Sequence, residues 1–481
     1  MFHRHRQGRE DVLERVPGRF GPENGLNLQD TTRRRANQSL HSALAEAEER
    51  YVAANPGSAR LQRTASANLP GGNTRTTVFF SPFPLYMASG KGSKLTDADG
   101  HEYVDFVNEY TAGLFGHSHP VVAEAIGEAI ASGINLGAPS EGEVKLSAAI
   151  RDRFPAMELL RFCNSGTEAN LLAMSAARAA SGKDAVMVFE GAYHGSLFTF
   201  NQGASPLNMP IPVVMSRYND AAKAVADIKV NSERLAAVLI EPMQGSAGAL
   251  PATGEFLHAI RDASSRHGPT LIFDEVMTSR VHSGGLQRKH GIAPDMVTLG
   301  KYLGGGITFG AFGGRRAIMD GFDPSQPNAL QHGGTFNNNV IAMTAGCRVM
   351  ERLLSEEALA AMNGRGDGLR EALNGLADTH RLPVQATGTG SIFGIHFHRG
   401  PLNNVEDIRE GERGREPQMA ALKKLFHFDM LAGGIYISRR LTANLSLMTS
   451  EAECAQFLGG VEEFFVNRGE LIRAALGEVS S

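Results

Sequence analysis

The sequence contains little cysteine: three residues in 481. An odd number without metal-ligand spacing indicates neither a disulfide framework nor a zinc site, and is typical of a reducing compartment. No apolar run is long enough to cross a bilayer, and the N-terminus lacks the apolar core of a secretory signal. We therefore predict a cytoplasmic protein with no membrane partner and no metal site.

A strong charge of one sign is also missing. The chain has 47 Lys and Arg against 51 Asp and Glu, a net charge of −4. Nucleic-acid binding needs a basic face, so no nucleic-acid partner is expected. Residues 1–38 are polar and irregular, with a basic run at 33–35. They are predicted to form a flexible extension.

A repeating alternation of short apolar runs and helical segments fills residues 117–345. The runs at 186–189, 236–240 and 271–273 have the length and composition of buried strands. Such strands, alternating with helices, predict an α/β fold with a mostly parallel sheet covered on both faces. This stretch is expected to be the large domain. Residues 39–116 and 346–481 are expected to join as a smaller α+β domain.

Ser165-Gly166-Thr167 follows one apolar stretch and opens a helical run. A turn of this kind offers free amides, two hydroxyls and the positive end of a helix dipole, which together bind phosphate. Ser and Thr also favour the N-cap of any helix, so taken alone the plain cap is the simpler interpretation.

Asp274 and Lys301 each end an apolar run, 27 residues apart. A buried carboxylate needs a partner, and opposite a pyridinium nitrogen it keeps that nitrogen protonated. A partly desolvated lysine amine has a lowered pKa, which favours a Schiff base with an aldehyde. The alternatives are a structural aspartate and a solvated surface lysine.

Tyr193 and His194 follow the run at 186–189, where an aromatic ring could lie against a planar cofactor. Without the other features, a loop tyrosine packed on the core is an equally good interpretation.

In this order and spacing, these segments resemble the class III pyridoxal-phosphate aminotransferases of fold type I. The chain looks closest to the β-amino-acid (β-phenylalanine-type) aminotransferases, with the glutamate-1-semialdehyde aminomutases as near relatives. The match runs from about Leu69 to the C-terminus. The segments that carry it are residues 69–76, 109–113, 116–120, 164–170, 273–280, 299–306 and 334–339.

The resemblance implies that pyridoxal 5'-phosphate is the cofactor and that Lys301 holds it as a Schiff base and shuttles the proton. It implies that Asp274 pairs with the pyridine nitrogen and that Tyr193 stacks on the ring with His194 close by.

It further implies that Ser165, Gly166 and Thr167 bind the phosphate. Thr335 would reach the phosphate of the neighbouring subunit, so a homodimer with shared sites is expected. Glu241 occupies the family's Glu-Pro position near the cofactor.

Arg75 is the expected substrate-binding residue, because the planar guanidinium matches a carboxylate with two hydrogen bonds. A surface or salt-bridged arginine is the alternative. Arg440 is a weaker second candidate, since the relatives have proline where this chain has Arg439. Which of these two points inward stays open.

The expected activity is ping-pong transfer of an amino group from a carboxylate-bearing amine, most simply a β-amino acid, to a 2-oxo acid. The loop at 137–141 looks more like the aminomutase version, whereas 109–111 and 335–337 look more like the β-amino-acid version and are given more weight. An intramolecular aminomutase and a racemase are the alternatives. A DNA-binding regulator is disfavoured because a 38-residue extension is too short for a typical domain.

Overall fold

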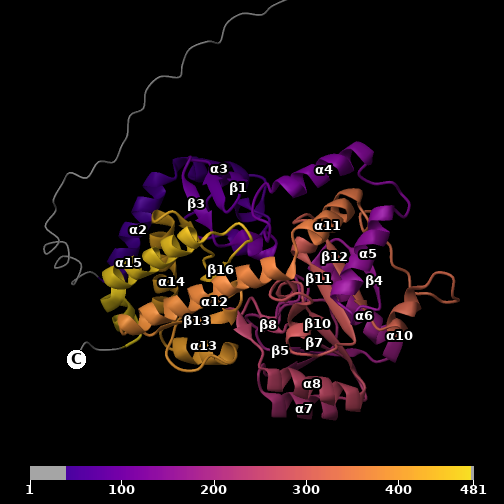
Figure 1. The fold of residues 1–481 in the computed structure, drawn as a ribbon. Helices are drawn as coiled ribbons and strands as arrows, with labels where there is room; N and C mark the ends of the chain where they lie inside the picture. Colours follow the sequence, from indigo (N-terminus) through magenta and orange to yellow (C-terminus); the bar gives the residue numbers. More distant parts are fainter. Residues whose placement is uncertain (1–38, 478–481) are drawn as a thin grey trace, which may run out of the picture. The chain divides into compact units, whose positions relative to one another are not determined.

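A seven-stranded sheet organises the fold of residues 39–477, the part of the chain that this computed structural model describes (Figure 1). Every pairing is parallel except those of one strand, β12, which runs antiparallel to both of its neighbours. The sheet is therefore mostly parallel, as predicted. Its strands lie in the order β4 (Leu159–Cys163), β12 (Gly310–Gly314), β11 (Met296–Gly300), β10 (Thr270–Asp274), β7 (Leu235–Ile240), β5 (Ala185–Phe189) and β6 (Val213–Ser216).

Both faces of this sheet are buried. Successive side chains of a strand point to opposite faces, so each strand contributes to two hydrophobic clusters. In β5, Val186 and Val188 pack in the cluster that includes helix α6 (Gly166–Ser181). Met187 and Phe189 point the other way, into the cluster formed with α7 (Ala221–Val230) and α8 (Gly254–His267). Figure 1 shows α7 and α8 side by side next to the sheet. The predicted α/β class is confirmed.

Two smaller sheets combine early and late segments. The first has the order β1 (Met87–Lys91), β2 (Lys94–Asp97), β3 (Glu102–Asp105) and β15 (Ile435–Tyr436), so residues 435–436 extend a sheet begun before residue 106. The second contains β13 (Val384–Thr389), β14 (Ile392–Phe397) and β16 (Thr442–Asn444). The expected domain division at 116/117 and 345/346 stays a prediction. The expected extension, 1–38, lies outside the described residues.

Capping residues set the helix starts. The side chain of Ser39 accepts a hydrogen bond from the amide of Ser42 at the start of α2 (Leu40–Ala54). The side chain of Asn339 accepts one from the amide of Ala342 at the start of α11 (Val340–Arg352). The other α-helices of residues 39–477 are α3 (Pro56–Ser66), α4 (Pro120–Ser132), α5 (Glu141–Arg153), α9 (Gly285–Lys289), α10 (Arg316–Met319), α12 (Glu356–Thr379), α13 (Val405–Glu412), α14 (Glu416–Ala432) and α15 (Glu451–Ala475).

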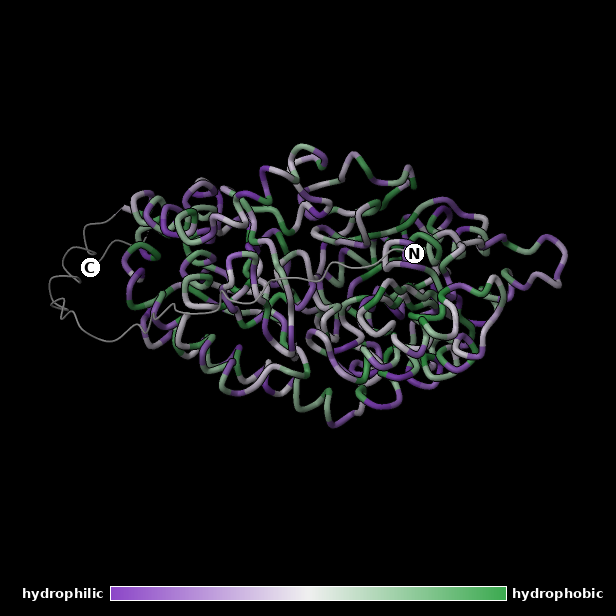
Figure 2. The backbone as a smooth tube through the Cα atoms, turned by 90° about the horizontal axis from the view of Figure 1, so that it is seen from above, coloured by the Kyte–Doolittle hydropathy of each residue, from purple (hydrophilic) through white to green (hydrophobic). Residues whose placement is uncertain are grey.

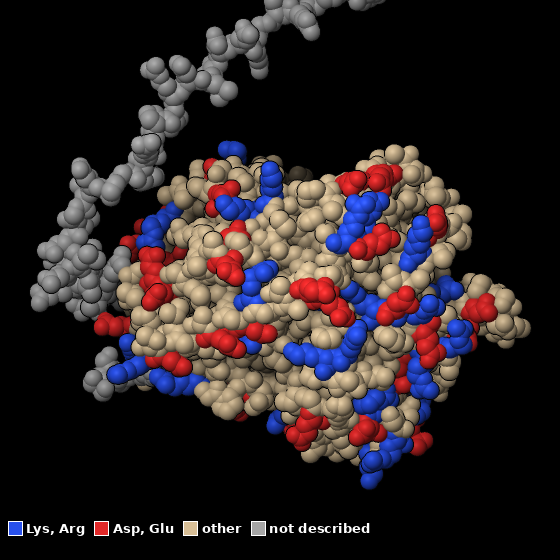
Figure 3. Space-filling view, viewed as in Figure 1, with Lys and Arg blue, Asp and Glu red and all other residues tan. Residues whose placement is uncertain are grey.

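The surface is of mixed character. Figure 2 shows hydrophobic and hydrophilic stretches alternating along the helices, as expected where one side of each helix is buried. On the face drawn in Figure 3, basic and acidic side chains are intermixed rather than gathered into a region of one sign. Between residues 39 and 477, no helix has the length and apolar character needed to span a membrane.

Candidate active site

The carboxyl ends of four neighbouring parallel strands bring the predicted residues together. Glu241 follows β7, Asp274 ends β10 and Lys301 follows β11, while Tyr193 and His194 lie in the loop after β5. Because parallel strands end at one edge of the sheet, ligands of open α/β folds bind there. Residues more than 100 positions apart in the sequence thus form one group.

Asp274 is 5% exposed and lies at the centre of a hydrogen-bond network. Its Oδ2 accepts from His194 Nδ1 at 2.8 Å and from Asn170 Nδ2 at 2.7 Å, and its Oδ1 accepts from the amide of Val276 at 3.1 Å. Asn170 is itself oriented by Thr298, whose hydroxyl donates to Asn170 Oδ1 at 2.6 Å. The carboxylate is therefore buried, fixed in direction and supplied with donors, while Oδ1 retains capacity for one more.

Lys301 is the first residue after β11, in the 3-10 turn η5 (Lys301–Gly304). Its φ of +56° is in the left-handed region, which is uncommon for a residue with a side chain and costs free energy there. Burial lowers the pKa of its amine, and the negative charges of Asp274 and Glu241 oppose that shift. The amine therefore loses its proton at a lower pH than an ordinary lysine does, as a nucleophilic amine requires.

Glu241 is held by two backbone amides. Its Oε1 accepts from Tyr193 at 2.9 Å and its Oε2 accepts from Gly245 at 3.1 Å. Burial raises the pKa of this carboxyl to about 7; the charge of Asp274 adds to the rise and His194 opposes it. Glu241 thus fixes the loop that carries Tyr193, which is itself 40% exposed.

The raised pKa of Glu241 predicts a pH-dependent stability. The unfolded chain releases this proton in the ordinary carboxyl range, whereas the folded protein retains it up to about pH 7, so folding weakens as the pH rises from about 5 to about 7. Burial raises the pKa of Glu275 to about 7 as well, so it adds to the same slope. We expect the thermal unfolding midpoint of the cofactor-free protein to fall over this range.

Glu241→Gln removes one of the two titrating groups and should flatten that fall, whatever it does to the midpoint itself. Differential scanning fluorimetry across the pH range measures the slope, with the exposed Glu470→Gln as a surface control. A slope that Glu241→Gln leaves unchanged would contradict the titration of this carboxyl.

The turn that opens α6 lies directly against the sheet. Ser165 is the N-cap, and its hydroxyl accepts from the amide of Glu168 at 3.2 Å, so the plain cap interpretation is correct as far as it goes. The amides of Gly166 and Thr167 have no acceptor within the helix, as at any helix start. A β-carbon on Gly310 would lie 2.4 Å from the carbonyl oxygen of Ser165, and one on Gly166 would lie 2.7 Å from Val276 Cγ1. Only glycine permits this close packing.

Arg75 and Arg440 lie on the other side of the group. The guanidinium carbon of Arg75 lies 5.5 Å from the ring centroid of Tyr110. Arg440 Nη1 donates to the hydroxyl of Ser246 at 3.3 Å, and burial lowers the pKa of this guanidinium. Of the two neighbouring arginines, Arg440 therefore contacts the loop that follows Glu241. This supports Arg440 over Arg439 as the inward residue.

Thr335 is exposed, and within residues 39–477 no hydrogen bond joins its side chain to the other predicted residues. Its segment is nevertheless attached close to the phosphate turn, because Asn164 Nδ2 donates to Asn337 Oδ1 at 2.9 Å. Its expected reach into a neighbouring subunit stays a prediction.

Three features of the site were not anticipated from the sequence. Asn170 bonds to Asp274, a role that its place in the first turns of α6 could have indicated. Arg280 is fully buried, although arginines are exposed by default. The 3-10 turn η3 (Asn108–Thr111) places Tyr110 beside Arg75, a contact across 35 residues that no local pattern announces.

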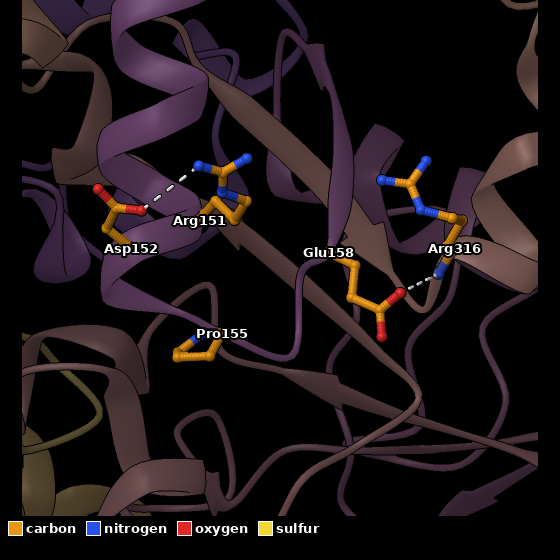
Figure 4. Close-up of a pocket in the computed structure, with 5 residues that line it drawn as sticks. All are labelled: Arg151, Asp152, Pro155, Glu158 and Arg316. Carbon is orange, nitrogen blue, oxygen red and sulfur yellow. Dashed lines mark hydrogen bonds and ion pairs between the residues drawn. The ribbon is translucent and has the colours of Figure 1, made fainter.

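A surface pocket of about 530 Å³ lies elsewhere, lined by Arg151, Asp152, Pro155, Glu158 and Arg316 (Figure 4). It lies by the amino end of β4, the edge of the sheet opposite to Lys301. Its charges are matched locally: Arg151 and Asp152 lie 3.7 Å apart, and the amide of Arg316 donates to Glu158 at 2.8 Å. We do not count it as part of the site.

Comparison with known proteins identifies the family of the chain. The family model for class-III aminotransferases matches residues 79–413. The β-phenylalanine transaminase of Variovorax paradoxus is 43% identical, over 91% of this chain and 99% of that protein. The chain belongs to the class-III aminotransferases. Like its family, this aminotransferase uses pyridoxal phosphate and works on an amino donor and a 2-oxo acid acceptor.

Solved structures agree with this assignment. The β-phenylalanine aminotransferase of V. paradoxus superposes with a TM-score of 0.87, covering 90% of this chain and 99% of that one at 42% identity. A glutamate-1-semialdehyde 2,1-aminomutase of Methanothermobacter thermautotrophicus is more distant, 37% identical over 74% of this chain and 87% of that protein. The predicted family and fold type are therefore confirmed.

The residues of this aminotransferase fit the cofactor. The first turn of α6 offers amides and hydroxyls of the kind that bind a phosphate group. Asp274 is a buried carboxylate with an acceptor position left, and the amine of Lys301 has a pKa lowered by burial. An unpartnered buried nitrogen, His194 Nε2, lies on the imidazole that bonds to Asp274.

Proposed function

We propose that this aminotransferase takes its amino group from a β-amino acid and passes it to 2-oxoglutarate or pyruvate in a ping-pong reaction. The observation that carries the proposal is the guanidinium of Arg75, held over Tyr110 with no ion pair among residues 39–477. Its charge is close enough to contribute to the lowered pKa of Lys301. A cation at this place can bind a donor carboxylate while the amino-bearing carbon lies near the lysine. The V. paradoxus relative, named for β-phenylalanine, supports this choice of donor.

The proposed cofactor contacts follow from the geometry. Ser165, Gly166 and Thr167 would hold the phosphate at the start of α6, and Asp274 would accept from the pyridine nitrogen. Tyr193, whose backbone Glu241 fixes, would lie against the ring with His194 below it. When bound, pyridoxal phosphate supplies an electron sink for the pair left on the amino-bearing carbon after proton loss.

Lys301 Nζ is the proposed proton carrier. Burial lowers the pKa of this amine, which favours its neutral form, and Nζ would accept the proton from the amino-bearing carbon and give it up later in the half-reaction. His194 and Asn170 both donate to Oδ2 of Asp274, which fixes the direction of this carboxylate. Arg75 meanwhile holds the carboxylate, which in a β-amino acid stands one carbon further from the amino-bearing carbon than in an α-amino acid.

We further propose a cytoplasmic homodimer with shared sites, in which Thr335 serves the partner's phosphate. Exposed apolar side chains on and around the Thr335 segment support this arrangement, because exposed apolar surface marks association sites. The amide of Val340 donates to the carbonyl of Ile134, which ties this segment to residues 130–144. The cytoplasmic location is supported by the three cysteines, all unpaired. The exposed apolar side chains that support the proposed dimer are Ile130, Ile134, Leu136, Val144 and Phe336.

A test of the donor class is to incubate the holoenzyme with β-phenylalanine and 2-oxoglutarate or pyruvate and to measure glutamate or alanine. Formation of either amino acid supports the proposal. If neither keto acid accepts an amino group from any β-amino acid, the proposed donor class is wrong. A 2,1-aminomutase, suggested by the loop at 137–141 and the aminomutase relative, would instead convert its substrate with no keto acid added.

Arg75→Met is expected to raise the KM for β-phenylalanine about 30- to 100-fold, because two charge-assisted hydrogen bonds to the carboxylate are lost. The kcat/KM for 1-phenylpropylamine, which has a methyl group in place of the carboxylate, should change much less. Arg60→Met, an exposed arginine of α3, is the matched control. Equal losses with the two donors would remove Arg75 from carboxylate binding.

A further inference from the structure

The turn η3 has an uncommon backbone. Its four residues, Asn108 to Thr111, have φ angles of 41°, 54°, 54° and 80°, and none of them is glycine. Each left-handed residue with a side chain costs free energy, so such a run persists only where surrounding contacts determine it. Contacts from the surrounding structure therefore determine the backbone of this turn.

The contacts that hold the turn come from three parts of the chain. Asp105 Oδ1 accepts from the amides of Val107 at 2.7 Å and Asn108 at 2.9 Å. Asn108 Nδ2 donates to the carbonyl of Asn444 at 2.6 Å, near the C-terminal end of the chain. These bonds fix Asn108, the first residue of the turn, and Arg280 fixes the last.

Arg280 is the largest fully buried side chain in the described residues. Its Nη1 donates to the carbonyl of Thr111 at 3.3 Å, and its Nη2 bonds to the carbonyl of Leu445. A buried guanidinium needs acceptors, and here main-chain carbonyls supply them. Arg280 thereby joins the segment after Asp274 to the last residue of η3.

The turn presents Tyr110 to Arg75. The phenol donates to the carbonyl of Thr77 at 2.8 Å, so the ring is fixed at its far end as well as at its backbone. The guanidinium carbon lies 5.5 Å from the ring centroid. Burial raises the pKa of the phenol, while the charges of Arg440 and Arg75 oppose the rise, so both candidate carboxylate-binding arginines are near enough to act on this ring.

We infer that Tyr110 is a positioning residue that holds the guanidinium of Arg75 in the orientation that receives the donor carboxylate. An arginine side chain loses much rotamer entropy when it is fixed, and a rigid aromatic face reduces that cost at the moment of binding. The inference rests on the proposed role of Arg75. It concerns affinity for carboxylates and leaves the proton transfer at Lys301 aside.

The test compares Tyr110→Leu, which removes the ring, with Tyr110→Phe, which keeps it. We measure KM and kcat for β-phenylalanine with 2-oxoglutarate, kcat/KM for 1-phenylpropylamine, and the Kd of 3-phenylpropanoate by calorimetry on the holoenzyme. Tyr110→Leu should raise both the KM and the Kd about 3- to 10-fold with kcat within about twofold, the range of a partly exposed cation–π contact. Tyr110→Phe should recover most of that affinity.

A double-mutant cycle with Arg75→Met separates positioning from a general effect on structure. In the Arg75→Met background, the leucine variant should weaken 3-phenylpropanoate binding less than about twofold, because the group that it positions is gone. Tyr86→Leu is the control for loss of a tyrosine from the same part of the chain, where the hydroxyl bonds to Gln62 and Gly72. If the leucine variant does not fold, Tyr110→Met gives the same comparison.

Three results would overturn the inference, and they are distinguishable. An affinity lost in Arg75→Met but kept in Tyr110→Leu, or a loss in Tyr110→Leu of equal size in both backgrounds, rejects positioning and leaves the proposed function standing. An unchanged Kd in Arg75→Met rejects the carboxylate role of Arg75, and the positioning of Tyr110 falls with it.

Discussion

Lys301→Ala is expected to lower transamination about 10⁴-fold or more, because we propose that one atom, Nζ, is both the covalent nucleophile and the proton carrier. Among residues 39–477, no other lysine directly follows a strand of the central sheet at the edge where Asp274 and Glu241 lie. The rate of the half-reaction with β-phenylalanine, followed by absorbance in single turnover, measures the loss.

Covalent attachment gives a second measurement that does not depend on turnover. Borohydride treatment of the holoenzyme followed by peptide mass spectrometry should place the reduced cofactor on Lys301 in the wild type and nowhere in Lys301→Ala. Lys289→Ala, an exposed lysine of α9, is the matched control. A wild type that carries no label on Lys301, or an alanine variant with near-normal turnover, would reject the assignment.

Asp274→Asn is expected to reduce the same half-reaction about 10²- to 10⁴-fold while leaving a folded protein. The amide keeps the shape of the carboxylate but removes the negative charge opposite the proposed pyridinium nitrogen. The new amide NH2 group is a donor, and it would face one of the three donors that now bond to the carboxylate. These donors are Asn170, His194 and the main-chain amide of Val276. Single-turnover kinetics and the absorbance spectrum of the bound cofactor measure the two effects separately.

The control for this variant is Asp262→Asn, on the exposed side of α8. A reduction below tenfold in Asp274→Asn, with the cofactor bound and the spectrum unchanged, would show that the charge of Asp274 is not required. A protein that cannot bind the cofactor at all would indicate a binding rather than an electronic role.

The large sheet was predictable because its parallel strands are nearly continuous apolar runs. The runs at 186–189, 236–240 and 271–273 correspond to β5, β7 and β10 within one residue at each end. The residues at their carboxyl ends were predictable as well, since polar side chains that follow such strands meet at one edge. That rule alone is enough to group Asp274, Glu241 and Tyr193.

Strand β12 could not be recognised in the same way. Three of its five residues are glycine, which weakens any strand signal. Packing explains them: β-carbons on Gly313 and Gly314 would lie 2.5 Å and 2.3 Å from the carbonyl oxygens of Leu159, in β4, and Asp295, which directly precedes β11. The requirement arises only when β4 and β11 are already in place, so a local pattern does not contain it.

The substrate side of the site was predictable only in part. Arg75 was identified through the resemblance, but the support behind it was not, because Tyr110 is placed by a left-handed turn without glycine. That turn depends on Asn444 and Arg280, more than 160 residues further along the chain. Long-range contacts of this kind override local preference and leave no periodic trace in the sequence.

The close packing of Gly166 and Gly310 has a consequence for the size of the molecule that this site accepts. The start of α6 packs against the main chain of Gly310 and the short, stiff side chain of Val276, so the interval between the proposed phosphate-binding turn and Lys301 has little freedom to change. We therefore expect the site to accept only cofactors close to one length. Substitutions elsewhere in the pocket should leave that length unchanged.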